Sequence, residues 1–471
     1  MLFTSMEFLF GFLPIVFFIY FILPKKARNY WLLAASLFFY GWGEPDFVII
    51  MVISIMFNYF SALCIVKLRK RQNKRKYAKR VLAFAITVNL LLLFVYKYLN
   101  FTVATIRAVF PWAREICEQT NFVLPIGISF FTFQAISYII DVYRGEPEQR
   151  NPFYVGLYIA LFPQLIAGPI VRYTTIKEQM EDRKLDFDLF SEGVYRFLLG
   201  FNKKVLLANT LAQVADMAWS MPERSVFMAW LGAVSYSLQI FFDFWGYSEM
   251  AIGLGQMFGF RFPENFNYPY ISKTITEFWR RWHISLSSWF RDYLYIPLGG
   301  SKVASHKKLV CNLMIVWIAT GVWHGASWNF ILWGMMYGVL ITMEKIVKNR
   351  KESIFYQVIT LLAIMMGWVL FRSEGIITAM TYFRSMLGLA GNRIMDSASL
   401  FYVREYIVFL IIGCLCSTPA IRVMKQKISE KGEKHAVICN LTGCVTQFLL
   451  FLVSVSCLVI NAHNPFIYFH F

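Results

Sequence analysis

Residues 309–345 read LVCNLMIVWIATGVWHGASWNFILWGMMYGVLITMEK, in which two apolar stretches flank one histidine, His324. An ionisable side chain in such sequence is a candidate functional residue, because hydrocarbon cannot solvate its charge and the protein must supply partners or water. His324 is therefore the leading candidate for chemistry in this chain.

His324 is expected to lie within the hydrocarbon layer. Lys307 and Lys308 mark a polar edge, and the mostly apolar residues that follow would rise about 24 Å in a helix before reaching the histidine. A bilayer core is about 30 Å thick. Gly321 and Gly325 break the helix beside the imidazole, and irregular backbone at membrane depth persists only against protein or water. We therefore predict a cavity at His324.

The whole chain has the composition of a polytopic membrane protein. Hydrophobic residues make up 58% of its 471 residues and charged residues only 16%, which excludes an ordinary soluble fold. We predict one all-α integral membrane domain over residues 1–471, with N-terminal spans in 1–120, a motif-bearing core in 121–346 and C-terminal spans in 347–471. Ten to twelve crossings are expected, at about 6–23, 29–42, 47–66, 81–99, 123–142, 154–171, 226–258, 309–323, 328–346, 355–371, 406–421 and 444–460. Residues 187–219 are predicted to be amphipathic, and the first span to be retained rather than cleaved.

The net charge of +18 is concentrated in short loops between apolar spans. Residues 67–80, KLRKRQNKRKYAKR, are the densest cluster. Such loops stay in the cytoplasm and contact anionic headgroups, so they favour topology determinants over nucleic-acid binding. Recruitment of an acidic cytoplasmic carrier is the alternative. Lys25 and Lys26 are expected on the cytoplasmic side, which places the N-terminus outside.

The eight cysteines lie mostly in apolar segments and show no paired CxxC spacing. Buried thiols of this kind behave as small hydrophobic residues. The sequence predicts neither a disulfide framework nor a metal site.

A charged aromatic segment lies just upstream of the first stretch, in residues 271–301, ISKTITEFWRRWHISLSSWFRDYLYIPLGGS. It is too charged to cross lipid alone and is typical of an interfacial or re-entrant helix. Glu277 and Arg281 are four residues apart, so they can share a helix face. The candidate site residues here are Arg280, Arg281, His283, Ser287 and Arg291. The alternatives are arginine anchors at the headgroup level and a structural histidine.

Carboxylates also occur inside an apolar span, in residues 235–253, SYSLQIFFDFWGYSEMAIG. Asp243, Tyr247 and Glu249 are candidate substrate-binding residues, because carboxylates in lipid usually face a lumen or a partner. Structural pairing with an arginine of the interfacial segment is the alternative. Pro125, Gly127, Pro163, Gly168 and Pro169 punctuate two further apolar stretches and predict kinked helices around a cavity.

Acyl transfer suits an intramembrane imidazole. A neutral histidine can remove a proton from a hydroxyl that attacks a thioester, and can then return it to the leaving group. The sequence contains no HExxH, phosphate loop or GxSxG motif, which disfavours metallohydrolases, ATPases and serine hydrolases. Composition alone would support a transporter equally well.

The order of motifs resembles the membrane-bound O-acyltransferase (MBOAT) family and, within it, the bacterial alginate O-acetyltransferase (AlgI-like) branch. The likeness extends over most of the chain, from LPIGISFFTFQAISYIIDVYRG and FPQLIAGPIVRY to the closing NPFIYFHF. It is carried chiefly by FDFWGYSEMAIGLGQMFGFRFPENFNYPYISKTITEFWRRWHISLSSWFRDYLYIPLGG, residues 242–300, followed by GVWHGASWNFILWG, residues 321–334.

The resemblance implies a ring of tilted helices around a thinned centre, with cavities from the two faces meeting at the histidine of the WHG motif. That histidine matches His324 as the catalytic base, and the histidine of the RWH motif matches His283. Trp323 and Asn329 complete the candidate substrate-binding residues. The chain departs from the usual FDFSGYSDMAIG at Trp245 and Glu249, which puts substrate detail in doubt.

The leading hypothesis is transfer of an acetyl group from a cytoplasmic thioester towards an exported polysaccharide. The resemblance implies acetyl-CoA or another acyl thioester as donor, no tightly bound cofactor, and an extracytoplasmic acetyltransferase as partner in a bacterial cytoplasmic membrane. Three alternatives remain: D-alanyl transfer to teichoic acid, a transporter or channel, and a scaffold for a secreted enzyme. The chain shows no internal repeat, which counts against transport.

Overall fold

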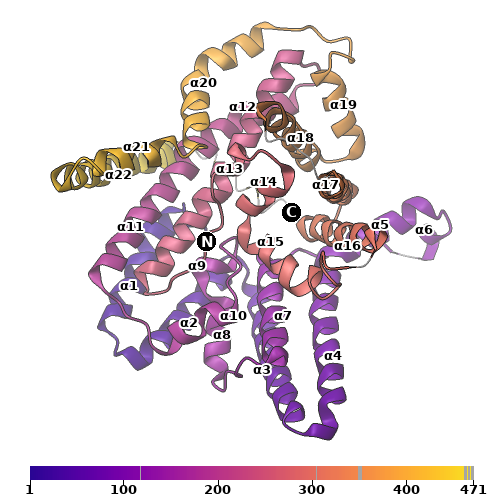
Figure 1. Cartoon of the computed structure of the whole chain (residues 1–471), viewed down its shortest axis with the longest axis vertical. Coiled ribbons are helices and arrows are strands. Elements are labelled where there is room, and N and C mark those ends of the chain that lie inside the picture. The colour runs from indigo at the N-terminus through magenta and orange to yellow at the C-terminus, as the bar shows by residue number, and fades with distance from the viewer. Residues whose placement is uncertain (117, 304, 348–352, 461–463, 465–466, 468–471) are drawn as a thin grey trace. The chain divides into compact units, whose positions relative to one another are not determined.

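The computed structural model describes residues 1–116, 118–303, 305–347, 353–460, 464 and 467, and these residues form helices and no strand (Figure 1). They divide into two compact units. The first unit contains Met1–Val194 and Ala251–Pro263, and the second contains Tyr195–Met250 and Glu264–Phe471. The all-α fold predicted from the sequence is therefore confirmed, while the single domain with its three divisions stays a prediction.

The first unit is a set of packed helices in which α3 and α2 make most of the contacts. Helix α3 packs against α4 and α7, and α2 packs against α1 and α8 (Figure 1). Its elements are η1 (Glu7–Phe12), α1 (Leu13–Ile22), α2 (Lys25–Gly43), η2 (Pro45–Phe47), α3 (Val48–Arg69), η3 (Gln72–Lys74), α4 (Arg75–Leu93), η4 (Phe94–Tyr98), α5 (Leu99–Val109), α6 (Ala113–Ile116), α7 (Ile128–Arg144), α8 (Pro152–Ala160), α9 (Phe162–Leu165), α10 (Tyr173–Glu181) and the start of α11 (Phe187–Asn202).

One predicted span of this unit is wrong. Residues 154–171 do not form a single helix, because α8 ends at Ala160 and Leu161 leaves the helical region with φ −54° and ψ 113°. The short α9 then begins at Phe162, with Pro163 in its first turn. Gly127, at the start of α7, has φ +76°, and a Cβ there would lie 2.8 Å from the Leu165 carbonyl oxygen. The proline and glycine residues thus interrupt the helix at a point that apolar composition alone does not indicate.

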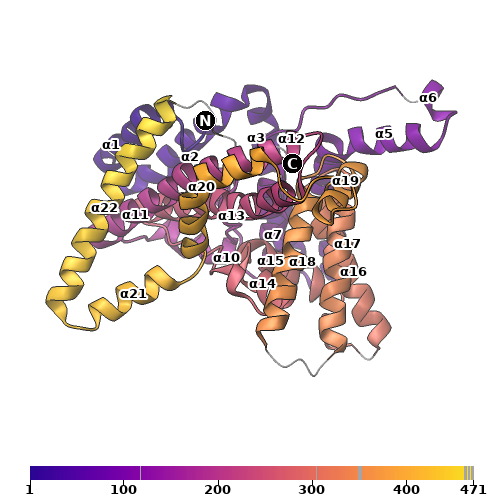
Figure 2. The ribbon, with the colours of Figure 1, turned by 90° about the horizontal axis from the view of Figure 1, so that it is seen from above.

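The second unit contains the long helix α13 up to Met250 and a set of helices that follow it in the chain. Figure 2 shows α16, α17 and α18 running side by side, and α17 packs against both of the others. Its elements are η5 (Lys203–Ala208), α12 (Asn209–Ser220), α13 (Val226–Met257), η6 (Pro269–Ile271), α14 (Ile275–Arg281), α15 (Ile284–Phe290), η7 (Arg291–Tyr295), α16 (His306–His324), α17 (Trp328–Ile346), α18 (Ile354–Arg372), α19 (Ile376–Met386), α20 (Ser397–Cys416), α21 (Ala420–Ser429) and α22 (Glu433–Ile460).

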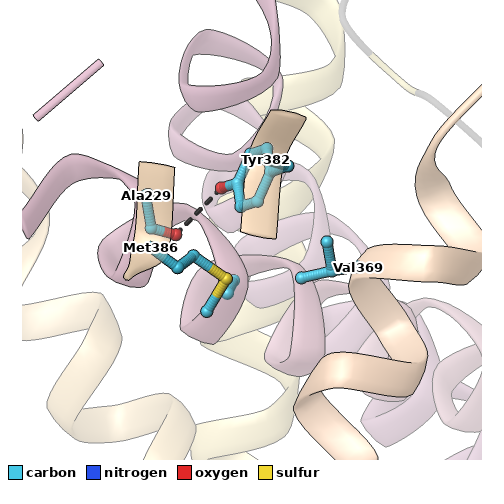
Figure 3. Close-up of a cluster of buried hydrophobic side chains, with 5 residues drawn as sticks. Ala229, Val369, Tyr382 and Met386 are labelled. Atoms are coloured by element: carbon cyan, nitrogen blue, oxygen red, sulfur yellow. Dashed lines mark hydrogen bonds between the residues drawn. The ribbon is translucent and has the colours of Figure 1, made fainter. Parts of the chain in front are cut away.

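A compact apolar cluster joins α13, α18 and α19 (Figure 3). Ala229, Val369 and Met386 are buried in it. Tyr382 contributes both surface and a polar contact, because its hydroxyl donates to the Ala229 carbonyl at 2.9 Å. Satisfying the hydroxyl removes the penalty of burying it, so the ring can pack fully. This cluster fixes α18 against α13 near the residues described below.

Six helical stretches of the described chain are long and apolar enough to cross a bilayer. They are Pro45–Arg69, Arg75–Val109, Val226–Met257, Ile354–Arg372, Ser397–Cys416 and Glu433–Ile460. The protein is therefore a multi-pass membrane protein, as its composition predicts. The expected ten to twelve crossings and the ring around a thinned centre stay predictions.

The backbones of α16 and α17 touch at two glycines, Gly321 and Gly334. A Cβ on Gly334 would lie 3.2 Å from the Gly321 Cα and would overlap the Trp317 carbonyl. We expect Gly334→Ala to lower the free energy of unfolding in detergent by about 1–3 kcal/mol, because an overpacked contact forces backbone shifts. Gly375→Ala is the control, since a Cβ there meets no atom within 4 Å. Equal unfolding free energies for the two variants would contradict this packing.

Candidate functional site

His324 is the last residue of α16, so the helix break predicted from the sequence is confirmed. Gly325 caps the helix in extended conformation, and α17 begins three residues later at Trp328. A Cβ on Gly325 would overlap the Phe330 ring, so the connection needs glycine at this position. The imidazole is 8% exposed. The turn therefore holds an ionisable group inside the second unit.

A cavity of about 10 Å³ borders His324, which confirms the cavity predicted there. The volume suffices for about one water molecule. Its walls are mainly aromatic and aliphatic, and the lining residues are Ile240, Asp243, Phe244, Trp282, His324, Trp333, Trp368, Phe371 and Ile467. Neither an acyl donor nor a sugar fits this volume without movement of the walls. The passages from the two membrane faces stay a prediction.

Aromatic rings fix the orientation of the His324 imidazole. Its centroid lies 5.0 Å from the Trp333 ring and 5.3 Å from the Phe371 ring, both edge-to-face. Trp323 lies 5.0 Å away on a third side. Such packing excludes water and disfavours a permanently charged imidazolium. The surroundings suit an imidazole that is neutral except while it holds a transferred proton.

His283 lies near His324, and both imidazoles contact the Trp323 ring. The Trp323 centroid is 6.0 Å from the His283 ring and 5.0 Å from the His324 ring. His283 joins α14 to α15 and is 1% exposed. Its φ of +44° is unusual for a residue other than glycine and indicates a backbone held by its surroundings. The sequence therefore brings its two histidines to one place.

Asn265 sets the tautomer of His283. The Asn265 Oδ1 atom accepts from the Ser285 backbone N–H at 3.2 Å, and it also lies 3.2 Å from Nδ1 of His283. Because this oxygen is an acceptor, Nδ1 of His283 must carry the proton, and Nε2 is the basic nitrogen. Asn265 Nδ2 in turn donates to Ser248 on α13. Burial lowers the pKa of His283 well below its usual value, and nearby His324 lowers it further.

Asp243 forms a buried ion pair with a lysine that sequence reasoning missed. Its Oδ1 atom lies 2.6 Å from Nζ of Lys204, and the two side chains are 2% and 3% exposed. The Lys204 ammonium also donates a hydrogen bond to Oδ1 of Asn209 at 2.8 Å. Lys204 therefore has two buried partners, the Asp243 carboxylate and the Asn209 amide oxygen. Oδ2 of Asp243 accepts from the Ile467 backbone N–H at 2.9 Å. The C-terminal segment therefore contributes to both the cavity wall and the Asp243 contacts.

Glu249 pairs with Arg196 at 2.5 Å, and Arg196 also binds Glu264. The sequence-based alternative, in which these carboxylates pair with an arginine of the interfacial segment, is wrong about the partners. The cations come from α11 and η5, whose backbones approach α13 because Gly200 and Gly246 allow it. Residues 187–219 are amphipathic, as predicted, and their polar face supplies these partners.

Trp245 takes the place of serine in the family pattern, and the structure gives it a contact. The Lys203 ammonium lies 3.1 Å from the centroid of the Trp245 ring, which is a cation–π geometry. Glu249, the second departure, retains a carboxylate and binds Arg196. The two departures therefore face the cations of η5 and α11.

The other candidate residues do not line the His324 cavity. Arg280 and Arg291 are exposed, and Arg291 binds its neighbour Asp292. Arg281 binds Glu277 at 2.9 Å, which confirms the shared helix face. Of the remaining three, Tyr247 is 3% exposed and Ser287 is partly buried. The third, Asn329, donates from its side-chain amide to the Ser373 carbonyl. Their substrate-binding roles stay predictions.

Comparison with known proteins gives a consistent result. The family model described as "MBOAT, membrane-bound O-acyltransferase family" matches residues 35–389. A "Probable alginate O-acetylase AlgI" of Azotobacter vinelandii is 39% identical over the full length of both chains. A "Peptidoglycan O-acetyltransferase" of Helicobacter pylori is 33% identical over 100% of this chain and 98% of its own. A "Teichoic acid D-alanyltransferase" of Bacillus subtilis is 32% identical over 54% of this chain and 70% of its own.

Proposed function

Because this chain belongs to the membrane-bound O-acyltransferase family, we propose that it transfers an acetyl group from a cytoplasmic thioester towards a hydroxyl of an exported polysaccharide. His324 carries the proposal, because it is a buried imidazole at a helix break beside a cavity. The 39% identity with a relative named as a probable alginate O-acetylase extends over both full chains and supports acetyl as the transferred group and a polysaccharide as the acceptor. The donor is acetyl-CoA or another acyl thioester, and no tightly bound cofactor takes part.

The chemistry needs one proton carrier. Neutral His324 removes the proton from the acceptor hydroxyl as its oxygen attacks the thioester carbonyl. The new C–O bond forms, the C–S bond breaks, and the imidazolium returns the proton to the departing thiolate. Surrounding aromatic rings keep water from competing with the acceptor for the acyl group. His283, held in one tautomer by Asn265, lies outside the cavity lining and offers a second basic nitrogen close to His324.

Asn265 is expected to act through His283. Asn265→Ala removes the acceptor that fixes the His283 tautomer, so we expect the rate of acyl transfer to fall about ten- to a hundred-fold, by analogy with the loss of a hydrogen-bond partner of a metal-binding histidine. Ser248→Ala is the matched control, because it removes a more distant bond of Asn265 and leaves Oδ1 in place. Similar rates for both alanine variants would contradict this role.

Asn265→Asp should change the pH dependence of the reaction. A carboxylate in contact with Nδ1 favours the protonated imidazole and raises the pKa of His283 towards its usual value. His283 then becomes protonated at a higher pH than in the native protein. We therefore expect the acid limb of the pH–rate profile to move to higher pH, measured as ester formation in membranes. An unchanged limb would show that His283 does not need to be neutral.

D-alanyl transfer to teichoic acid is the second candidate, favoured by the similarity to the Bacillus subtilis transferase. A deletion strain complemented with this chain distinguishes the two. Mild alkali releases esters from the envelope and exported polymers, and we expect restored acetate and unchanged D-alanine. Restored D-alanine with no change in acetate would replace the proposal by its rival. The membership of an acyltransferase family leaves the transporter and scaffold alternatives without support.

The geometry of the pathway is also part of the proposal. A donor in the cytoplasm and an acceptor outside require a partner acetyltransferase that finishes the polymer on the outer side of a bacterial cytoplasmic membrane. We propose no nucleic-acid partner. The basic loops instead set the topology of the chain and contact anionic headgroups of the bilayer. Co-purification of an extracytoplasmic acetyltransferase with the tagged full chain tests the partner.

A further inference from the structure

An apolar groove lies along the first helical hairpin, in the first unit. Its volume is about 590 Å³, and it runs between the continuous helix Glu7–Ile22 and α2. Ile15, Phe38 and Trp42 line it and are each more than half exposed. The groove therefore opens to the surroundings of the hairpin, which are lipid chains where the hairpin lies in the bilayer. Its size is that of a site for an elongated apolar ligand.

A basic pocket of about 130 Å³ lies at the turn that joins the two helices of the hairpin. Lys25, Lys26, Arg28 and Arg183 line it. Among the residues that the structure describes, no carboxylate lies within ion-pair distance of any of these four cations. Two acidic residues also line the pocket, which leaves an excess of two positive charges.

The pocket has a rigid floor. Nη1 of Arg183 donates to the Asn29 side chain. Its Nη2 donates to the Tyr20 hydroxyl at 3.0 Å, and its Nε donates to the Phe258 carbonyl at 3.0 Å. The Arg28 guanidinium lies 5.1 Å above the Tyr20 ring. Two guanidinium groups thus occupy defined positions around Tyr20. Arg28 Nε donates to the Leu23 carbonyl at 3.1 Å, so the Nη groups of Arg28 and the two lysine ammonium groups are the donors that can reach a phosphate, while Arg183 adds positive charge.

The pocket and the groove follow one another along the hairpin. Arg28 in the pocket is one helical turn from Trp31 in the groove, and Trp31 Nε1 donates to the Val16 carbonyl on the facing helix at 3.1 Å. From Trp31 to Trp42 α2 rises about 16 Å, at 1.5 Å per residue. A bilayer core is about 30 Å thick, so this length matches about one leaflet.

We propose that this hairpin binds one anionic phospholipid, with its phosphate in the basic pocket and an acyl chain in the groove. The excess positive charge selects an anionic headgroup over a zwitterionic one. Lys25 and Lys26 are expected on the cytoplasmic side, where basic pockets between helices meet anionic lipids. The bound lipid fixes the depth of the hairpin in the bilayer and is independent of the acyl-transfer chemistry.

Native mass spectrometry of the full chain, released from nanodiscs of phosphatidylglycerol and phosphatidylcholine, tests the proposal. We expect one retained phosphatidylglycerol. The variant with Lys25→Gln, Lys26→Gln and Arg28→Gln should lose affinity roughly a hundred-fold, because each basic residue near the headgroups contributes about a five-fold gain in binding. The matched control carries Lys74→Gln, Arg75→Gln and Lys76→Gln at the end of η3 and the start of α4, which removes the same charge elsewhere. Equal retention in both triple variants overturns the proposal.

A second variant tests the groove without changing any charge. Gly11 lines the groove, and a Cβ there meets no atom within 4 Å, so we expect Gly11→Phe to place its ring in the groove. We expect it to release phosphatidylglycerol while the protein keeps its native unfolding midpoint in detergent. Inorganic phosphate at millimolar concentration should not displace the lipid. Displacement by phosphate, or full lipid retention in Gly11→Phe, would show a phosphate pocket that does not use the groove and would overturn the proposal.

Discussion

Replacement of His324 by alanine is expected to lower acyl transfer by about two to four orders of magnitude, the contribution of a positioned general base. The imidazole is the ionisable group at the end of α16 that borders the cavity, and alanine cannot take the hydroxyl proton. The measurement is the ester content of the polymer in a deletion strain complemented with the variant. The amount of the variant in the membrane must be measured in the same cells.

Two further variants separate chemistry from folding. His324→Gln keeps a polar side chain of similar size but cannot act as a base, so it should be as inactive as the alanine variant. His306→Ala removes an exposed histidine from the first position of the same helix and should leave acylation unchanged. Native ester levels in His324→Ala, at a native amount of membrane protein, would remove His324 from the mechanism.

The helical pair around His324 could be predicted closely from the sequence. The predicted span 328–346 coincides with α17, and the predicted 309–323 falls within α16, His306–His324. Apolar run length and the flanking lysines fix such helices, because every backbone polar group in lipid must be satisfied within the helix. The glycines beside His324 mark where the run stops. Local sequence therefore determined this part of the site.

Contacts between distant segments could not be predicted in the same way. The sequence leaves two readings of Asp243 open, substrate binding and pairing with an arginine of the interfacial segment, yet its partner is Lys204 on η5. Hydropathy shows that a carboxylate in an apolar span needs a partner but does not show which cation reaches it. Asn265 was missed for a related reason, since its role depends on the positive φ of His283 and on Ser285. Ile467 reaches Asp243 from the far end of the chain.

The ion pair between Lys204 and Asp243 should have a large effect on stability. Lys204→Met leaves a buried carboxylate without its cation, and we expect the free energy of unfolding in detergent to fall by about 3–5 kcal/mol. Asp243→Leu should have a similar effect, because it leaves the buried ammonium. Glu264→Gln is the control: this carboxylate is 59% exposed, and loss of its pair with Arg196 should change stability by about 1 kcal/mol or less.

The double variant Lys204→Met with Asp243→Leu separates the two roles of this pair. Two apolar side chains of similar volume remove both buried charges, so most of the lost stability should return. Acyl transfer should stay low in the double variant, because Asp243 lines the cavity beside His324 and its carboxylate is then absent. A double variant as unstable as either single one would show that the charges are not the source of the effect. A stable double variant with native acyl transfer would restrict Asp243 to a structural role and leave the proton chemistry to the two histidines.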